Sequence, residues 1–351
     1  MKIDHVHFYV EDAKIWRDWF VHHLGFQAVA DRSISFHTCT EVVKSGAVCF
    51  FLSSPLLPTS PVAEFLHQYP PGVADVAFAI EDVESAIALA QKHGATILQP
   101  IQERQVGTEF LKCGKIAAWG GLTHTLIERS LVFDKGQITN DNTFTAIDHI
   151  VLNVAVGELE NAVAWYENIL DFQPQQAFKI KTDRSALHSQ VMVSRNGSVQ
   201  LPINEPATRN SQIQEFLDVN RGPGIQHIAL RTTNLVSVIA KFRANNLSLL
   251  SVPQSYYTQL KQRPGLPLSP QELEAIAQQE ILVDWQEYTP LEGGNIAPLL
   301  LQIFTQPIFE QPTFFFEFIE RRYQAQGFGE GNFRALFEAI ESEQIKRGTL
   351  Q

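Results

Sequence analysis

The chain has 351 residues, of which 44% are hydrophobic and 19% are charged, and its formal net charge is −11 at pH 7. Because single cores stop growing near ~250–300 residues, this length indicates two domains. The acidic balance argues against nucleic-acid binding, which needs clustered Lys and Arg to contact phosphates. No apolar run reaches the ~18 residues of a membrane span, and the N-terminus does not resemble a secretory signal.

The cysteine content indicates a reducing compartment. The chain has three cysteines, Cys39, Cys49 and Cys113. An odd number with this spacing fits neither a disulfide framework nor a cysteine-ligated zinc site. We therefore expect a cytoplasmic protein with no membrane or nucleic-acid partner.

The first half of the chain alternates short apolar strands with helices. In chain order we expect a strand opening at Ile3-Asp4-His5-Val6, a helix over 13–20, a strand over 47–52, a strand opening at Gly72, a helix over 83–93 and a strand over 125–129. Apolar and β-branched runs bounded by turn residues are typical of strands. The polar segment 131–143, which contains Gly and Asn, is the expected linker.

The second half repeats this order. Three segments correspond between the halves: Ile147-Asp148-His149-Ile150 with the opening strand, Gly224-Ile-Gln-His227 with Gly72-Val-Ala-Asp75, and Glu317-Phe-Ile-Glu-Arg321 with Thr125-Leu-Ile-Glu-Arg129. Helices are expected over 159–166 and 235–245. We therefore predict an α+β fold with two tandem related domains, residues 1–135 and 144–351. Each domain consists of βαβββ-type repeats that curl a mixed sheet around a central space.

The repeat isolates three positions that could bind a metal. There the second half has His149, His227 and Glu317, and the first half has His5, Asp75 and Thr125. Two imidazoles and one carboxylate form the facial triad that binds Fe(II) and leaves coordination positions open. Threonine is a poor iron ligand, so we expect a metal in the second domain and a scaffold role for the first.

Each of these histidines taken alone is more often a core histidine than a ligand, so Glu317 carries more weight. It lies inside the run Phe314-Phe-Phe-Glu-Phe-Ile319. A carboxylate in such a run must face solvent, be paired or bind a metal. The two-residue period of a strand places Glu317 on the same face as Phe315 and Ile319, which indicates an inward, apolar face.

Several long motifs in the second half occur in a characteristic order. They are Leu201-Pro-Ile-Asn-Glu205, Ser211-Gln-Ile-Gln-Glu-Phe216, Gly224-Ile-Gln-His227, Pro253-Gln-Ser-Tyr-Tyr257, Leu301-Gln-Ile-Phe-Thr-Gln-Pro307, the segment 312–321 and the segment 327–337. Together they resemble the 4-hydroxyphenylpyruvate dioxygenase family, which has the vicinal-oxygen-chelate fold. The first half resembles that family in layout only.

This resemblance implies a set of site residues and an activity. It implies Fe(II) bound by His149, His227 and Glu317, catalytic polar groups at Ser189, Asn204, Gln226 and Gln302, and substrate-binding residues at Gln212, Phe304, Phe315, Asn332, Phe333 and Phe337. The implied reaction is oxidative decarboxylation and ring hydroxylation of the 2-oxo acid 4-hydroxyphenylpyruvate by O₂, with migration of the side chain, giving homogentisate and CO₂. The resemblance also implies a homodimer or a homotetramer.

The segment from Gly331 to Arg347 is predicted to be a closing helix. Phe333, Leu336, Phe337 and Ile340 fall on one helical face, a pattern that also fits a core helix. The preceding Gly327-Phe-Gly-Glu-Gly331 is expected to be a gate or a tight turn.

Three other functions remain open at this stage. Hydroxymandelate synthase oxidises the same substrate at the benzylic carbon, a non-catalytic binding relative could keep the fold, and an extradiol dioxygenase would use a similar triad on catechols.

Overall fold

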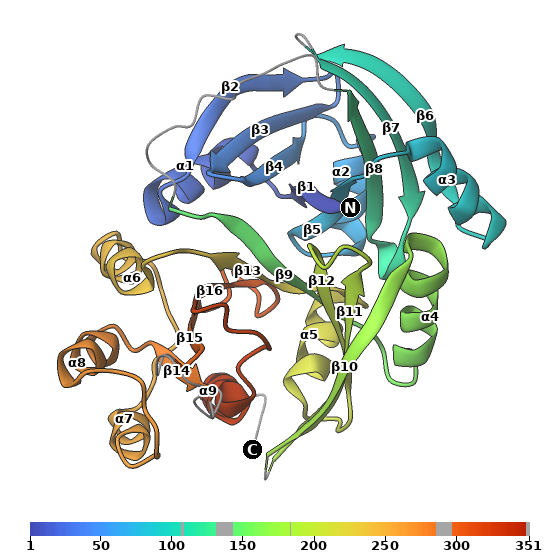
Figure 1. Ribbon diagram of the computed structural model, residues 1–351. Coiled ribbons are helices and arrows are strands. Elements are labelled where there is room, and N and C mark those ends of the chain that lie inside the picture. The colour runs from blue at the N-terminus through green and yellow to red at the C-terminus, as the bar shows by residue number, and fades with distance from the viewer. Residues whose placement is uncertain (107–108, 131–142, 183, 286–296, 349–351) are drawn as a thin grey trace.

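The computed structural model describes residues 1–106, 109–130, 143–182, 184–285 and 297–348. In this part of the chain two eight-stranded sheets have the same strand order (Figure 1). The first is β2-β3-β4-β1-β5-β8-β7-β6 and the second is β10-β11-β12-β9-β13-β16-β15-β14. Each strand of the first sheet thus has a counterpart eight strands later.

The described part of the first half contains eight strands, three α-helices and one short 3-10 helix. They are β1 (Lys2–Tyr9), α1 (Ala13–Leu24), β2 (Gln27–Ile34), β3 (Thr38–Ser45), β4 (Val48–Pro55), α2 (Pro61–Gln68), β5 (Gly72–Ala79), α3 (Val83–Lys92), β6 (Ile97–Val106), β7 (Glu109–Ala117), η1 (Trp119–Gly121) and β8 (Thr123–Ser130). Asp12 caps the N-terminus of α1 through its carboxylate, and Gly25 ends that helix with a φ of 68°, a backbone angle that glycine adopts without strain.

The second half repeats this pattern with added helices. Its elements are β9 (Ala146–Asn153), α4 (Leu159–Leu170), β10 (Phe172–Lys181), β11 (Ala186–Ser194), β12 (Gln200–Pro206), α5 (Gln212–Asn220), β13 (Gly224–Arg231), α6 (Leu235–Ala244), α7 (Gln254–Leu260), α8 (Pro270–Gln278), β14 (Leu282–Trp285), β15 (Leu299–Phe304), β16 (Phe315–Arg322) and α9 (Glu330–Arg347). The helices α7 and α8 have no counterpart among the described residues of the first half.

Both sheets are mixed in direction. Strand β1 runs parallel to β4 and antiparallel to β5, and β5 runs parallel to β8. The strands β9, β12, β13 and β16 show the same relations. The predicted α+β fold with tandem βαβββ repeats is therefore confirmed. The predicted boundary at 135 lies within residues 131–142, outside the described residues, and the boundary at 144 comes shortly after them, so both stay predictions.

A β-bulge recurs at the same place in both halves. The pairing of β13 with β9 shifts register between Ile225 and His227. The pairing of β5 with β1 shifts between Val73 and Asp75. A bulge leaves one residue unpaired and turns its side chain away from the regular alternation, so Gln226 and His227 do not have to lie on opposite faces.

One hydrophobic core joins the two halves. The ring of Phe316 on β16 lies 5.8 Å from the rings of Phe20 and Phe50, which belong to the first half. Phe8 lies 5.1 Å from Phe314 in an edge-on contact, a favourable geometry for aromatic pairs. The two halves therefore pack through aromatic side chains, and the sheets are not separate bodies on a flexible tether.

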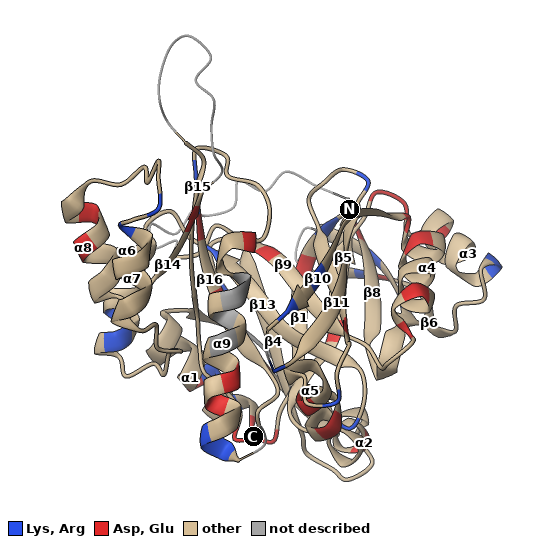
Figure 2. Cartoon of the chain, turned by 90° about the horizontal axis from the view of Figure 1, so that it is seen from below, with Lys and Arg blue, Asp and Glu red and all other residues tan. Residues whose placement is uncertain are grey.

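Helix α9 lies across the open side of the second sheet, where it contacts β14, β10 and α5 (Figure 1). Lys346 and Arg347 follow its acidic residues at the C-terminal end (Figure 2), where positive charge complements the helix dipole. No helix of the described chain is long and apolar enough to cross a membrane.

Candidate metal centre

Three adjacent central strands of the second sheet present the predicted triad. His149 lies on β9, His227 on β13 and Glu317 on β16, and they are 2%, 9% and 2% exposed. Ala229 on the middle strand pairs with His149 on one side and with Glu317 on the other. His227 precedes Ala229 by two residues, so it shares that face. The sheet register therefore brings the three side chains together.

The distances within the triad fit a metal ion. Nε2 of His149 lies 3.1 Å from Oε2 of Glu317, and Nε2 of His227 lies 3.7 Å from the same oxygen. All three ligand atoms lie within 4.8 Å of one another. Ligand atoms about 2.1 Å from a metal and at right angles to one another would be ~3 Å apart. Two imidazole nitrogens and one carboxylate oxygen form the donor set of the facial triad.

The electrostatics of the triad are those of a cation site. Burial disfavours a charged His149, but the negative charges of Glu317 and Asp148 outweigh it and raise the pKa of this imidazole to about 9. Burial and the neighbouring His149 hold the pKa of His227 well below its usual range. Nδ1 of His227 has no hydrogen-bond partner. In the metal-free site, one proton thus partly offsets the charge of Glu317.

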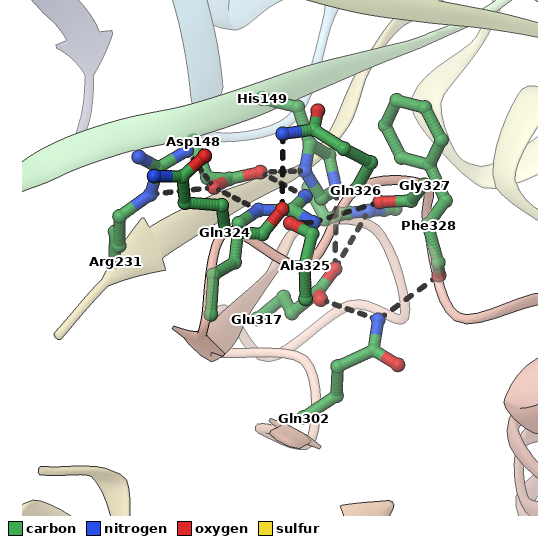
Figure 3. Close-up of polar contacts among 12 residues, drawn as sticks. Asp148, His149, Arg231, Gln302, Glu317, Gln324, Ala325, Gln326, Gly327 and Phe328 are labelled. Carbon is green, nitrogen blue, oxygen red and sulfur yellow. Dashed lines mark hydrogen bonds and ion pairs between the residues drawn. The ribbon is translucent and has the colours of Figure 1, made fainter. Parts of the chain in front are cut away.

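A buried carboxylate orients His149. Asp148 accepts a hydrogen bond from Nδ1 of His149 at 3.0 Å. Its oxygens also accept hydrogen bonds from Arg231 and Arg321, as Figure 3 shows for Arg231. These contacts hold the pKa of Asp148 well below its usual range although burial acts in the opposite direction. The tautomer with the proton on Nδ1 leaves Nε2 free to bind a metal.

The corresponding place in the first half has a different composition. Asp75 pairs with Thr123 as His227 pairs with Phe315, which aligns Thr125 with Glu317. The carboxylate of Asp75 accepts a hydrogen bond from Thr123 at 2.5 Å and lies 3.6 Å from Nζ of Lys115. A lysine ammonium thus neighbours this carboxylate. The scaffold role of the first half stays a prediction.

The triad opens into a pocket that contains nearly all of the predicted site residues. The pocket is lined by His149, His227 and Glu317, by the polar residues Ser189, Asn204, Gln212, Gln226, Gln302 and Asn332, and by Phe304, Phe315 and Phe337. The side chain of Phe333, the remaining predicted residue, lies outside the described residues. The roles assigned to these residues stay predictions.

The pocket also has walls that the sequence reasoning did not identify. They are Val151, Phe178, Ile180, Leu187, Val191, Ile213, Phe328, Gly329 and Ile340, and Pro202 lines the pocket as well. The ring of Phe328 lies 5.2 Å from that of His149. Its position between two glycines with positive φ is the available signal, since an apolar residue in such a turn needs a buried site. Phe178 on a mostly exposed strand gives no such signal.

Comparison with known proteins agrees with this architecture. The family model of the glyoxalase/bleomycin resistance protein/dioxygenase superfamily matches residues 2–110 and 146–263, more than half of the chain. The chain therefore belongs to this superfamily. A triple mutant of 4-hydroxymandelate synthase from Streptomyces coelicolor has a similar fold, with a TM-score of 0.85 over 98% of both chains at 24% identity.

Sequence relatives identify a family within this superfamily. The 4-hydroxyphenylpyruvate dioxygenase of Coccidioides posadasii is 37% identical over 99% of this chain and 94% of its own length. The enzyme of the same name from Caenorhabditis briggsae is 37% identical over 99% of this chain and 93% of its own. The chain thus belongs to the 4-hydroxyphenylpyruvate dioxygenase family of non-haem iron dioxygenases, and it is an enzyme.

Proposed function

We propose that this enzyme uses Fe(II), held by His149, His227 and Glu317, and O₂ to convert 4-hydroxyphenylpyruvate to homogentisate and CO₂. The observation that carries the proposal is a buried triad whose ligand atoms lie within 4.8 Å of one another and that lines a pocket together with aromatic rings. Three protein ligands leave three positions on a six-coordinate iron. These positions would let the carboxylate and keto oxygens of a 2-oxo acid bind together with O₂ beside the three side chains.

The bound iron would supply the activation of O₂ and the oxidative decarboxylation of the chelated keto acid. The side chains of the pocket would hold the aromatic end of the substrate. Phe304 and Phe315 lie 6.3 Å apart and are nearly perpendicular, which provides one face and one edge for a substrate ring. Misplacing that ring would lower turnover more than metal binding.

The polar side chains of the pocket would orient the substrate and tell its two ends apart. Ser189 and Asn204 face each other across the β11–β12 pair, and Gln226 lies at the bulge of β13 beside the triad. Gln212 belongs to the first turn of α5, and its Oε1 is buried without a partner. Because an unsatisfied buried acceptor is costly, Gln212 would gain a hydrogen bond from a phenol hydroxyl.

Exclusion of water would depend on α9, which we propose as the lid of the pocket. Asn332, Phe337 and Ile340 of this helix line the pocket. Glu341 accepts 2.6 Å hydrogen bonds from Thr182 and Ser185, which closes the helix over the β10–β11 hairpin. A closed lid would protect a reactive oxidant from solvent.

Product analysis tests the proposal. The metal-free protein is loaded with Fe(II), supplied with 4-hydroxyphenylpyruvate and O₂, and its products are separated by chromatography with mass detection. Homogentisate with equimolar CO₂ is the expected result. Formation of 4-hydroxymandelate would shift the oxygenation to the benzylic carbon, and O₂ uptake with catechols alone would indicate an extradiol enzyme. Iron binding without O₂ uptake would leave a non-catalytic relative.

The proposal also includes a cytoplasmic homodimer or homotetramer. The three cysteines are free and buried, which agrees with a reducing compartment. Light scattering of the purified protein measures the assembly directly, and a monomer would contradict this part of the proposal.

A further inference from the structure

A continuous chain of hydrogen bonds links α7 to the candidate metal ligand Glu317. Oη of Tyr256 lies 2.9 Å from Oδ1 of Asn332. Nδ2 of Asn332 donates to Oε1 of Gln302 at 3.0 Å. Nε2 of Gln302 donates to Oε1 of Glu317 at 2.9 Å. The chain crosses from α7 through α9 and β15 to β16, and its final link is visible in Figure 3.

The donor and the acceptor of each of these hydrogen bonds follow from Glu317, the carboxylate at the end of the series. An ionised carboxylate only accepts hydrogen bonds, and Gln302 also faces the carbonyl of Phe328 at 3.0 Å, so its amide nitrogen must point toward both. The amide oxygen of Gln302 then faces Asn332, which must present its nitrogen. This leaves Oδ1 of Asn332 to accept from Tyr256. The same hydroxyl accepts from the backbone N–H of Val283 at 2.8 Å and also lies 3.0 Å from the carbonyl of Val283, which is a second acceptor for its one proton. The amide orientations are thus determined by the network itself.

The two carboxylate oxygens of Glu317 have different neighbours. Oε1 accepts from Gln302, whereas Oε2 is the oxygen that lies near both triad histidines. Gln302, Asn332 and Glu317 are 2–3% exposed, so water does not compete for these bonds. A carboxylate held in this way presents one oxygen to a metal.

The backbone beside these hydrogen bonds leaves room for the side chain of Gln302. Gly329 has a φ of +76°, and a Cβ on it would lie 2.0 Å from Oε1 of Gln302. This turn brings the carbonyl of Phe328 to the amide of Gln302 and starts α9 directly afterwards. The position of Asn332 in that helix therefore depends on how the turn closes over Gln302.

We propose that Tyr256 is a positioning residue that, through Asn332 and Gln302, holds Glu317 as a one-oxygen metal ligand. This inference rests on the proposed metal site and assigns a role to a residue that does not line the pocket. It also makes the metal ligand sensitive to α9, since Asn332 belongs to that helix. Tyr256 keeps its proton for this donation, because burial raises the pKa of its hydroxyl.

The test compares two tyrosines on the same helix. Tyr256→Phe removes the hydroxyl that begins the chain. Tyr257→Phe removes a buried hydroxyl that donates to the carbonyl of Ile281 at 2.9 Å, outside the chain. Each protein is titrated with Co(II) against a chromophoric chelator, and the visible spectrum of the bound Co(II) is recorded.

We expect Tyr256→Phe to weaken Co(II) binding by about threefold to tenfold, the low end of what supporting residues of a metal site contribute, and to shift its ligand-field bands. Tyr257→Phe should match the unsubstituted protein in both. In the Fe(II) enzyme, Tyr256→Phe should lower kcat with KM within about twofold. Adding Tyr256→Phe to Asn332→Ala should cause little further loss, because the chain is already broken.

Two results would overturn the inference. One is a Tyr256→Phe protein with unchanged Co(II) affinity and spectrum. The other is an equal loss in both tyrosine variants, which would indicate a general effect of α7 on stability. If the unsubstituted protein bound no Co(II), or if Glu317→Gln bound it normally, the proposed metal site itself would fail. The two failures are therefore distinguishable.

Discussion

Glu317 shows how the place of one residue could be predicted from sequence, although its hydrogen bond with Gln302 could not. Its place in an apolar run and the internal repeat predicted an inward carboxylate beside two histidines, and the structure places it there, 2% exposed. The hydrogen bond from Gln302 has no signal in the sequence, since it depends on which rotamer a neighbouring strand allows. The predicted contact of the Gln302 amide with substrate stays a prediction.

Replacing Glu317 with Gln tests the triad at the residue scale. The amide keeps the shape but removes the negative charge and one strong metal ligand, so Fe(II) affinity should fall by at least about a hundredfold. Glu320→Gln is the matched control. Glu320 is buried on the same strand, where it caps the N-terminus of α6 through the backbone N–H of Leu235. This variant should lose some stability and keep its iron, as measured by calorimetric titration. An equal loss of iron affinity in the two variants would contradict the assignment of Glu317 as a metal ligand.

Proton release on metal binding is a second prediction at this scale. The pKa of His149 in the metal-free protein is raised to about 9, so this imidazole is protonated at neutral pH, whereas a ligand imidazole must be neutral. Binding of Fe(II) should therefore release about one proton, and the affinity should rise about tenfold per pH unit until the pH approaches 9. His227 adds no proton, because its pKa is lowered. Calorimetry in buffers of different ionisation enthalpy measures the release, and zero release would contradict this.

At the scale of elements, periodicity located the strands and helices but not their irregularities. The repeated motifs predicted β9, β13 and β16 and the helices between them. Alternation alone would place Gln226 and His227 on opposite faces, whereas the bulge of β13 lets both line the pocket. A bulge arises from pairing with a neighbouring strand, which a single sequence does not reveal. Helix α8 was not predicted, although Ser269 and Glu272 form its capping box, a pattern that marks the N-terminus of a helix.

Asp148 offers a test of how three strands are held together. Asp148→Asn weakens contacts to Arg231 on β13, Arg321 on β16 and His149 on its own strand. Because it leaves the buried charge of Arg321 partly unpaired, we expect a loss of about 3 kcal/mol in the free energy of unfolding. We also expect tenfold to a hundredfold weaker iron binding, roughly the usual effect of a supporting residue.

The internal repeat supplies the control for Asp148. In the first half, Asp4 contacts His5 and Arg129 in the same arrangement. Asp4→Asn should reduce stability and leave the iron affinity unchanged, as shown by denaturant unfolding and metal titration of both variants. A similar loss of iron affinity in the two variants would mean that the effect of Asp148 on the metal is only a general loss of stability.

At the scale of the whole molecule, the duplication of the fold could be predicted and the packing of the halves could not. Corresponding motifs indicated two related domains, and the identical strand orders of the two sheets confirm them. Which apolar side chains of one half meet the other depends on surfaces that no periodicity marks. Phe316 is an example, since its neighbours Phe20 and Phe50 lie far away in sequence.

This shared core predicts that the two halves unfold together. Phe316→Ala should lower the stability of the whole chain by about 3–5 kcal/mol, the usual range for a buried phenylalanine. It should shift a single calorimetric transition. Phe36→Ala is the control, because Phe36 is 84% exposed, and it should leave the transition in place. Two transitions, of which Phe316→Ala shifts only one, would show that the halves unfold independently.

The most direct test of the central claim is the mass spectrum of the product formed from 4-hydroxyphenylpyruvate under isotopically labelled O₂. Decarboxylation by O₂ leaves one of its oxygen atoms in the new carboxylate and the other for the ring. We expect homogentisate with one labelled oxygen in the carboxylate and one on the ring, and no such product from Glu317→Gln. Label on the benzylic carbon, or an unlabelled product, would contradict it.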